Sequence, residues 1–121
     1  MGKYFLDSLK FLIKEYKYTS KKFKTVTYFR QSMHSYLLWI HILETYYSKK
    51  FKTSEQLVNS LKQYASRKTI LTILNNSLKL GYMEKQKSEK DKRVSNYIPT
   101  EITIKEYEEW KRNLQDNIWK Y

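Results

Sequence analysis

The chain has 121 residues, a length that suits one domain with a single core and leaves no room for a separate catalytic domain. Its 24 Lys and Arg against 12 Asp and Glu give a formal net charge of +12, which favours a polyanionic partner, nucleic acid first among them. The absence of cysteine excludes disulfides, thiolate nucleophiles and cysteine metal ligands, and the cytosol is the expected compartment. Few glycines and prolines and many aromatic residues indicate a helical domain.

Residues 4–18 predict an amphipathic helix that packs against the core or against a second subunit. The apolar residues that share one face at helical spacing are Phe5, Leu9, Leu12, Ile13 and Tyr16. Asp7 and Glu15 dilute its cationic side, so a membrane-surface role is disfavoured, and charged residues interrupt any signal-peptide core or membrane span. Residues 19–25 carry three lysines and no apolar period, and we expect a loop there.

The longest helical pattern covers residues 27–47, where apolar residues recur every three or four positions. We expect one long core helix. It contains His34 and His41, which are seven residues apart and lack further ligands, so they form no metal motif. These histidines and Trp39 would suit a small-molecule pocket at the surface of the helix, but an aromatic stripe is more often core.

Two further helices with a short turn between them are indicated by their N-terminal signals. Thr53 and Gln56 form a capping box, and the helix that they open should end near residues 63–65. Ser66 is a candidate N-cap for the second helix, residues 66–80, which Gly81 ends. Its buried stripe consists of Ile70, Leu74 and Leu78. This order predicts a helix-turn-helix.

Two short strands, residues 82–87 and 94–98, should follow and flank the polar run 88–93, which must project as a wing. The chain also concentrates its positive charge here. Residues 62–93 contain nine Lys and Arg against three acids, a net of +6, whereas residues 101–121 contain four against five, a net of −1.

Residues 103–106 read as a second capping box, which would open a last helix running to the end of the chain. Its apolar stripe consists of Tyr107, Trp110, Leu114 and Ile118. We expect the two terminal helices to meet. If they do so across a two-fold axis, the interface would be formed by Phe5, Leu9, Leu12, Tyr107, Trp110, Leu114 and Ile118.

The stretch from Ser66 to Thr100 resembles the MarR-like winged-helix transcriptional regulators. The match lies in the opening of the second helix at residues 66–70, its closing Leu-x-Leu-Gly-Tyr at 78–82, the wing tip 91–93, and Pro99 to Glu101. It covers about a third of the chain, and Ser77 and Leu78 depart from members that have leucine four residues before the glycine. The resemblance implies a homodimeric, often ligand-responsive DNA-binding repressor. It also implies that Arg93 enters the minor groove and that Asp91 orients it.

The expected fold is therefore mainly α with a small β-hairpin wing, a winged helix-turn-helix with flanking N- and C-terminal helices. Residues 1–121 form one domain, in which 53–100 are the helix-turn-helix and wing, and 1–48 and 101–121 are the flanking, dimerisation helices. We expect a double-stranded DNA-binding regulator of transcription that acts as a homodimer, without a cofactor or membrane association and with no identified effector. The predicted DNA contacts are Ser66, Arg67, Lys68, Thr69, Thr72, Asn76, Lys87, Lys90, Asp91, Lys92 and Arg93.

Catalysis is not expected, because the sequence has no glycine-rich phosphate loop and no Cys or His pair with metal-ligand spacing. The carboxylates of Glu106, Glu108 and Glu109 are expected on a solvated helix face. Two alternatives to a sequence-specific regulator remain open. One is a winged helix that serves as a protein-interaction or replication-initiation module without strong sequence preference. The other is an RNA-binding domain, which the short polar side chains on the second helix disfavour.

Overall fold

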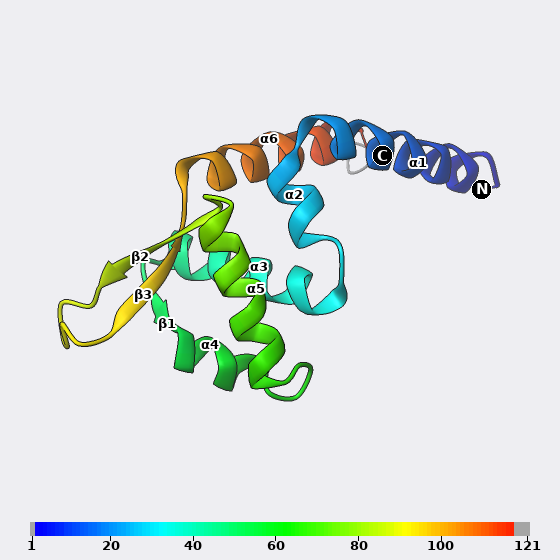
Figure 1. The fold of residues 1–121 in the computed structure, drawn as a ribbon. Helices are drawn as coiled ribbons and strands as arrows, with labels where there is room; N and C mark the ends of the chain where they lie inside the picture. The colour runs from blue at the N-terminus through cyan, green and yellow to red at the C-terminus, as the bar shows by residue number, and fades with distance from the viewer. Residues whose placement is uncertain (1, 118–121) are drawn as a thin grey trace.

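The computed structural model describes residues 2–117 and shows six helices and a three-stranded sheet in that range (Figure 1). In chain order these are α1 (Gly2–Lys22), α2 (Lys24–Phe29), α3 (Met33–Ser48), β1 (Lys52–Thr53), α4 (Ser54–Leu61), α5 (Arg67–Lys79), β2 (Met83–Lys87), β3 (Ser95–Pro99) and α6 (Glu101–Asn117). The chain is mainly helical with a small antiparallel sheet, as the sequence predicts. Within this range, none of the helices combines the length and apolar content that crossing a membrane requires.

Each of the two helices in the helix-turn-helix begins at a side-chain cap. The hydroxyl of Thr53 accepts from the backbone N–H of Gln56, and the Gln56 side chain accepts from the N–H of Thr53, so the capping box is confirmed. Ser66 caps α5 by accepting from the N–H of Thr69 at 3.1 Å. After α5 the backbone turns at Gly81, whose φ of 78° lies in the left-handed region that favours glycine.

The wing is an antiparallel pair of strands extended by a short third strand. β2 pairs with β3 from Met83 opposite Pro99 to Lys87 opposite Ser95, close to the predicted strand positions. The sequence does not indicate β1, whose two residues pair with the other edge of β3 and place β3 in the middle of the sheet. β1 joins the start of α4 directly to the wing, so the wing and the helix-turn-helix share one backbone framework.

The predicted loop at residues 19–25 is wrong, because α1 continues to Lys22 and α2 starts at Lys24. Polar side chains in this segment are buried by the rest of the chain. Thr25 is fully buried, and both its N–H and its hydroxyl donate to Oε1 of Glu106 on α6, at 2.8 and 2.6 Å. These tertiary contacts keep the segment helical despite its lysines.

The single helix predicted for residues 27–47 is instead two helices, α2 and α3, separated by residues 30–32. Ser32 starts α3 by accepting from the N–H of Ser35. Arg30 leaves the helix and donates to Glu15 on α1 at 3.0 Å. The Ser32 cap and the Arg30–Glu15 ion pair therefore interrupt the helix that the apolar period predicts.

The second predicted capping box, at residues 103–106, is also wrong, because α6 already begins at Glu101. Thr103 is fully buried and its hydroxyl donates to the carbonyl of Tyr82 at 2.7 Å. Glu106 accepts from Thr25, as described above. Both residues therefore connect α6 to neighbouring elements instead of capping it.

The terminal helices are joined by a buried hydrogen bond. Nε1 of Trp110 on α6 donates to Oε1 of Glu15 on α1 at 2.8 Å, and the guanidinium of Arg30 lies over the Trp110 ring. Trp110 is 8% exposed and stands against Trp39 of α3, so it belongs to the core of its own chain rather than to an open interface face. Toward its N-terminus, α1 extends beyond the rest of the molecule (Figure 1).

Candidate nucleic-acid interface

One face of α5 is packed against the core and the other is open. Ile70, Leu74 and Ser77 are fully buried, and the hydroxyl of Ser77 donates to the carbonyl of Leu74 at 2.8 Å, which satisfies it inside the core. On the opposite side, Lys68, Thr72 and Asn76 are spaced four residues apart and exposed. Exposed Asn75 and Lys79 continue this polar face.

Two of the predicted contact residues, Ser66 and Thr69, bond to each other at the N-terminal cap of α5. The Ser66 hydroxyl lies 2.9 Å from that of Thr69 and also accepts from the Thr69 N–H. Their first role is therefore to start α5, and Thr69 is half-buried. Lys68, Thr72 and Asn76 are the more accessible part of the set.

Arg67, the first residue of α5, is paired with Glu55 of α4 through Nη1 and Oε2. The hydrogen bond from Arg67 lowers the pKa of the Glu55 carboxyl, and the same bond raises the pKa of the guanidinium. Both side chains remain more than half exposed. Glu55 is not among the residues predicted from the sequence, because a pair that joins two helices across a turn leaves no periodic signal.

The wing tip is organised by Asp91. Its Oδ1 accepts from the backbone N–H of Arg93 at 3.0 Å and from Nε of Arg93 at 3.1 Å, and its Oδ2 accepts from Nη2 at 3.3 Å. The side-chain hydrogen bonds from Arg93, followed by the backbone one, hold the pKa of Asp91 below its ordinary value. The Arg93 side chain is 90% exposed, so it is oriented by Asp91 and otherwise open to a ligand.

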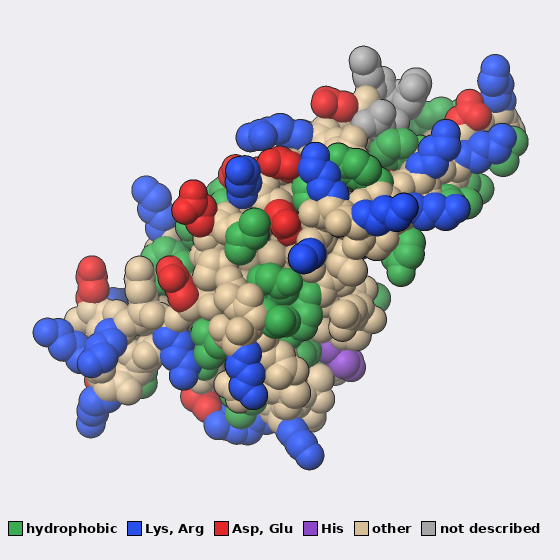
Figure 2. Space-filling view, turned by 45° about the horizontal axis from the view of Figure 1, so that its top comes forward, with side chains coloured by type: hydrophobic (Ala, Val, Ile, Leu, Met, Phe, Trp, Pro, Cys, Tyr) green, Lys and Arg blue, Asp and Glu red, His purple; other side chains and the backbone are tan. Residues whose placement is uncertain are grey.

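The cations of the helix-turn-helix and wing are all exposed. They are Lys62, Arg67, Lys68, Lys79, Lys85, Lys87, Lys90, Lys92 and Arg93. Figure 2 shows Lys and Arg side chains gathered on the wing, which projects at the left of the view. Because these charges lie on a projecting hairpin and an open helix face, they can contact a phosphate backbone without any rearrangement of the core.

Three hydrogen bonds that the sequence pattern does not reveal fix α5 and the wing to the body. The hydroxyl of Tyr28 on α2 donates to the carbonyl of Ile73 in α5 at 3.1 Å, and burial raises the pKa of Tyr28. At the base of the wing, Thr100 donates to the carbonyl of Gly81 at 2.7 Å, and Thr103 to that of Tyr82. Side chains from α2, from the end of the wing and from α6 therefore help to set the relative placement of α5 and the wing.

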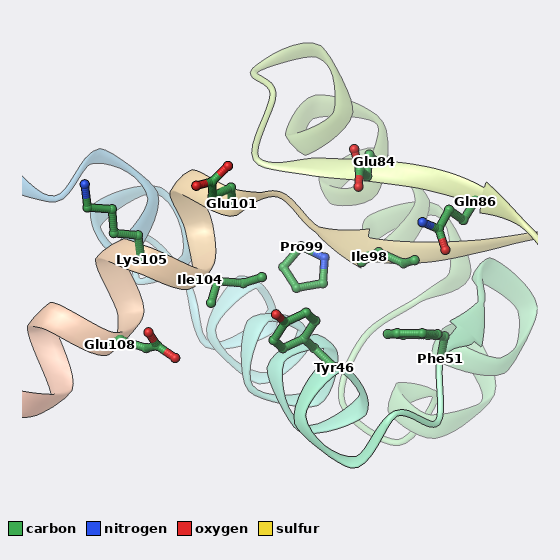
Figure 3. A pocket seen from close by; sticks show the side chains of 10 residues that line it. All are labelled: Tyr46, Phe51, Glu84, Gln86, Ile98, Pro99, Glu101, Ile104, Lys105 and Glu108. Atoms are coloured by element: carbon green, nitrogen blue, oxygen red, sulfur yellow. The ribbon is translucent and has the colours of Figure 1, made fainter.

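A hollow of about 640 Å³ lies between the end of α3, the sheet and α6 (Figure 3). Its charged lining residues are three carboxylates, Glu84, Glu101 and Glu108, and one amine, Lys105. Glu108 also accepts from the hydroxyl of Tyr47 at 2.7 Å, and burial first, then this hydrogen bond, raises the pKa of Tyr47. The excess of carboxylates makes this face unsuited to a polyanion. Among residues 2–117, no group of three or more His, Asp or Glu is arranged to hold a metal ion.

The residues predicted for a dimer interface fall into two groups. Phe5, Leu9 and Leu12 are 54%, 58% and 47% exposed along α1. Tyr107 and Leu114 are partly buried against the core, beside buried Trp110. Ile118 lies outside the described residues. The structure therefore leaves the α1 half of the predicted interface open and uses most of the α6 half within the chain.

Solved structures with the same arrangement of elements are winged-helix regulators. The chain is 14% identical to a mutant of MepR from S. aureus bound to an oligodeoxyribonucleotide, with a TM-score of 0.59 over 89% of this chain and 77% of that one. It is 19% identical to a MarR transcriptional regulator from Methanosarcina mazei Go1, with a TM-score of 0.51 over 88% and 73% of the two chains. The fold is that of the MarR-like winged-helix regulators.

A third similar structure is the transcriptional repressor CouR bound to a 23-mer DNA duplex, at 11% identity and a TM-score of 0.56. The match covers 78% of this chain and 62% of CouR, so the chain spans less than two thirds of that protein. No protein-family model matches the sequence, and no curated protein matches it either. The assignment of the MarR-like winged-helix fold therefore rests on structural similarity. It agrees with the resemblance seen in residues 66–100.

Proposed function

We propose that this chain is a sequence-specific double-stranded DNA-binding regulator of transcription, a MarR-like repressor that acts in the cytosol as a homodimer. The observation that carries the proposal is the exposed polar face of α5 beside a wing whose cations are all exposed on a fixed base. MepR and CouR, which share the fold, are seen bound to DNA. The acidic lining of the hollow near α6 supports binding through the basic surface of α5 and the wing instead.

In the proposed mechanism, α5 and the wing divide the work. The helix enters the major groove, where Thr72 and Asn76 reach base edges and Lys68 a phosphate or base. The wing follows the flanking backbone with Lys87, Lys90 and Lys92, and Arg93 enters the minor groove, held by Asp91. Phosphate contacts would then fix the register, and base contacts would supply the sequence preference.

The homodimer is supported by the apolar surface of α1. Seven large apolar side chains between Tyr4 and Tyr16 are 44–66% exposed on a helix that extends away from the body (Figure 1). Together they expose much more apolar surface than single apolar residues scattered over a protein surface. A second copy of α1 offers the same surface, so a two-fold axis would cover both. Leu114 and the exposed edge of α6 can join this interface, whereas Trp110 is already used inside the chain.

Such a dimer would place two copies of α5 about 34 Å apart, one turn of B-DNA. Each copy would read the same sequence on opposite strands. We therefore propose a near-palindromic operator with half-sites one helical turn apart.

Replacing Arg93 with alanine tests the role of the wing. The change should weaken binding to the preferred duplex by about 1 to 3 kcal/mol, the usual loss of an arginine that reads a groove. The melting temperature should stay nearly unchanged, because the side chain is 90% exposed and its hydrogen bonds go to Asp91, two residues away. Fluorescence anisotropy with a duplex selected by the wild-type protein measures the first quantity, and calorimetry the second.

Lys10→Ala is the matched control, because it removes one exposed positive charge from α1, remote from the wing. It should leave the affinity within about twofold of the wild type at ~0.15 M salt, where charges that distant are screened. If Arg93→Ala and Lys10→Ala bind equally well, Arg93 does not enter the minor groove and the proposed role of the wing tip is wrong.

A further inference from the structure

The ion pair between Glu55 and Arg67 joins the start of α4 to the start of α5. Glu55 is the second residue of α4 and Arg67 the first of α5, so the pair bridges the helix-turn-helix on its outer surface. The two side chains are 60% and 58% exposed. The contact is therefore made at the surface and not in the packed interface between the helices.

Stability does not account for this pair. The two helices are held together by side chains that are almost fully buried, Leu57 and Leu61 on α4 and Ile70 and Leu74 on α5. An exposed ion pair adds little to such packing, because solvent screens it and two long side chains must be ordered to make it. A carboxylate in the first turn of α4 also complements the helix dipole. That role needs no partner, so the pairing itself points to an effect on Arg67.

The charge of Glu55 is exceptional in its surroundings. It is the only acidic residue among positions 45–83, which contain seven Lys and Arg. A free carboxylate beside the helix proposed to enter the DNA groove would repel phosphates. Pairing with Arg67 neutralises it, and the same pairing restrains the long cationic side chain at the start of α5.

We propose that Glu55 is a positioning residue that sets the DNA sequence preference through Arg67. The inference rests on the proposed function. Glu55 holds one amino group of the guanidinium, and the remaining N–H donors of the planar group are left to meet a base edge, as in the bidentate contact of arginine with guanine. An arginine already held in one orientation loses less conformational freedom when the duplex binds.

Without this restraint, the long side chain of Arg67 would reach the nearest phosphate. Phosphates are present at every position of every duplex, so binding would become stronger to any sequence and less selective. Loss of Glu55 should thus raise non-specific affinity while it lowers discrimination. Loss of a residue that only supported the fold would not raise non-specific affinity while lowering discrimination.

The test compares Glu55→Gln and Glu55→Asp with the wild type, using two probes of equal composition. One probe is the duplex that the wild-type protein selects from a random pool, and the other is its scrambled sequence. Glu55→Gln should bind the scrambled duplex more tightly, reduce the preference for the selected duplex about tenfold, and steepen the logarithmic salt slope by about 0.9, one extra phosphate contact. Glu55→Asp keeps the charge but has a shorter reach, and it should also lose preference.

The decisive comparison is made in an Arg67→Ala background. There Glu55→Gln should leave the ratio of the two affinities unchanged, because the residue through which Glu55 acts is gone. Glu89→Gln on the wing loop is the control for simple removal of an acid, and it should raise both affinities by the same factor.

The inference is overturned if Glu55→Gln behaves like Glu89→Gln, with an unchanged ratio, or if it lowers the ratio equally in the Arg67→Ala background. In either case a wild-type protein that still prefers the selected duplex leaves the proposed function standing. If instead the wild type itself binds both probes equally, sequence-specific regulation fails and the inference fails with it.

Discussion

Leu9→Glu should convert a dimer to a monomer and abolish tight DNA binding at the same time. Leu9 is 58% exposed on α1, remote from α5 and the wing, so any loss of DNA affinity must pass through the assembly. Burying a leucine contributes roughly 1.5 to 3 kcal/mol. The two-fold axis places one Leu9 from each subunit in the interface, so the dimer dissociation constant should rise by about two to four orders of magnitude. Light scattering should give a mass near 14.9 kDa for the variant and twice that for the wild type.

Lys14→Glu introduces the same side chain on the polar side of α1 and changes the charge by more. It should remain dimeric and bind DNA, which separates loss of apolar contact from added negative charge. Trp110→Glu is unsuitable here, because Trp110 is buried and bonded to Glu15, and its replacement would destabilise the protomer itself. A wild-type mass near 14.9 kDa with undiminished binding to a single half-site would show that the protein acts as a monomer.

Salt should weaken the proposed complex steeply. Nine exposed Lys and Arg lie on the helix-turn-helix and wing, and six phosphate contacts by them would lower the affinity on the order of a thousandfold between about 50 and about 200 mM monovalent salt. Each contact releases a counterion condensed on the duplex, so the logarithm of the affinity should fall linearly with the logarithm of the salt concentration. Anisotropy titrations at several salt concentrations give the slope.

The same titrations with Lys87→Ala should give a slope shallower by about 0.9, since one phosphate contact is removed. Lys10→Ala on α1 should leave the slope as it is. A wild-type affinity that does not change with salt would contradict a nucleic-acid partner and favour a winged-helix protein-interaction module.

The parts of the fold that could be predicted are those fixed by neighbouring residues. The Thr53 and Ser66 caps, the stop at Gly81 and the two main strands of the wing each depend on side-chain and backbone bonds within a few positions. The Asp91–Arg93 bond at the wing tip is equally local, spanning two residues. Such features leave their signal in the sequence.

The errors occur where distant parts of the chain decide the structure. Residues 19–25 look like a loop until Thr25 meets Glu106, which lies 81 positions away, and Trp110 looks like an interface residue until Glu15 accepts its N–H across 95 positions. Glu55 and Arg67 stand on separate helices, so no helical period connects them. Only the packed structure brings these partners together.

The most direct test of a sequence-specific DNA-binding regulator is a gel shift with wild-type protein and three probes. These are the duplex that flanks its own coding sequence, a random duplex of the same length, and single-stranded RNA. We expect a discrete complex with the flanking duplex at concentrations at least about a thousandfold below those needed for the random duplex or the RNA. Equal binding to all three probes, or none to any, would contradict this function.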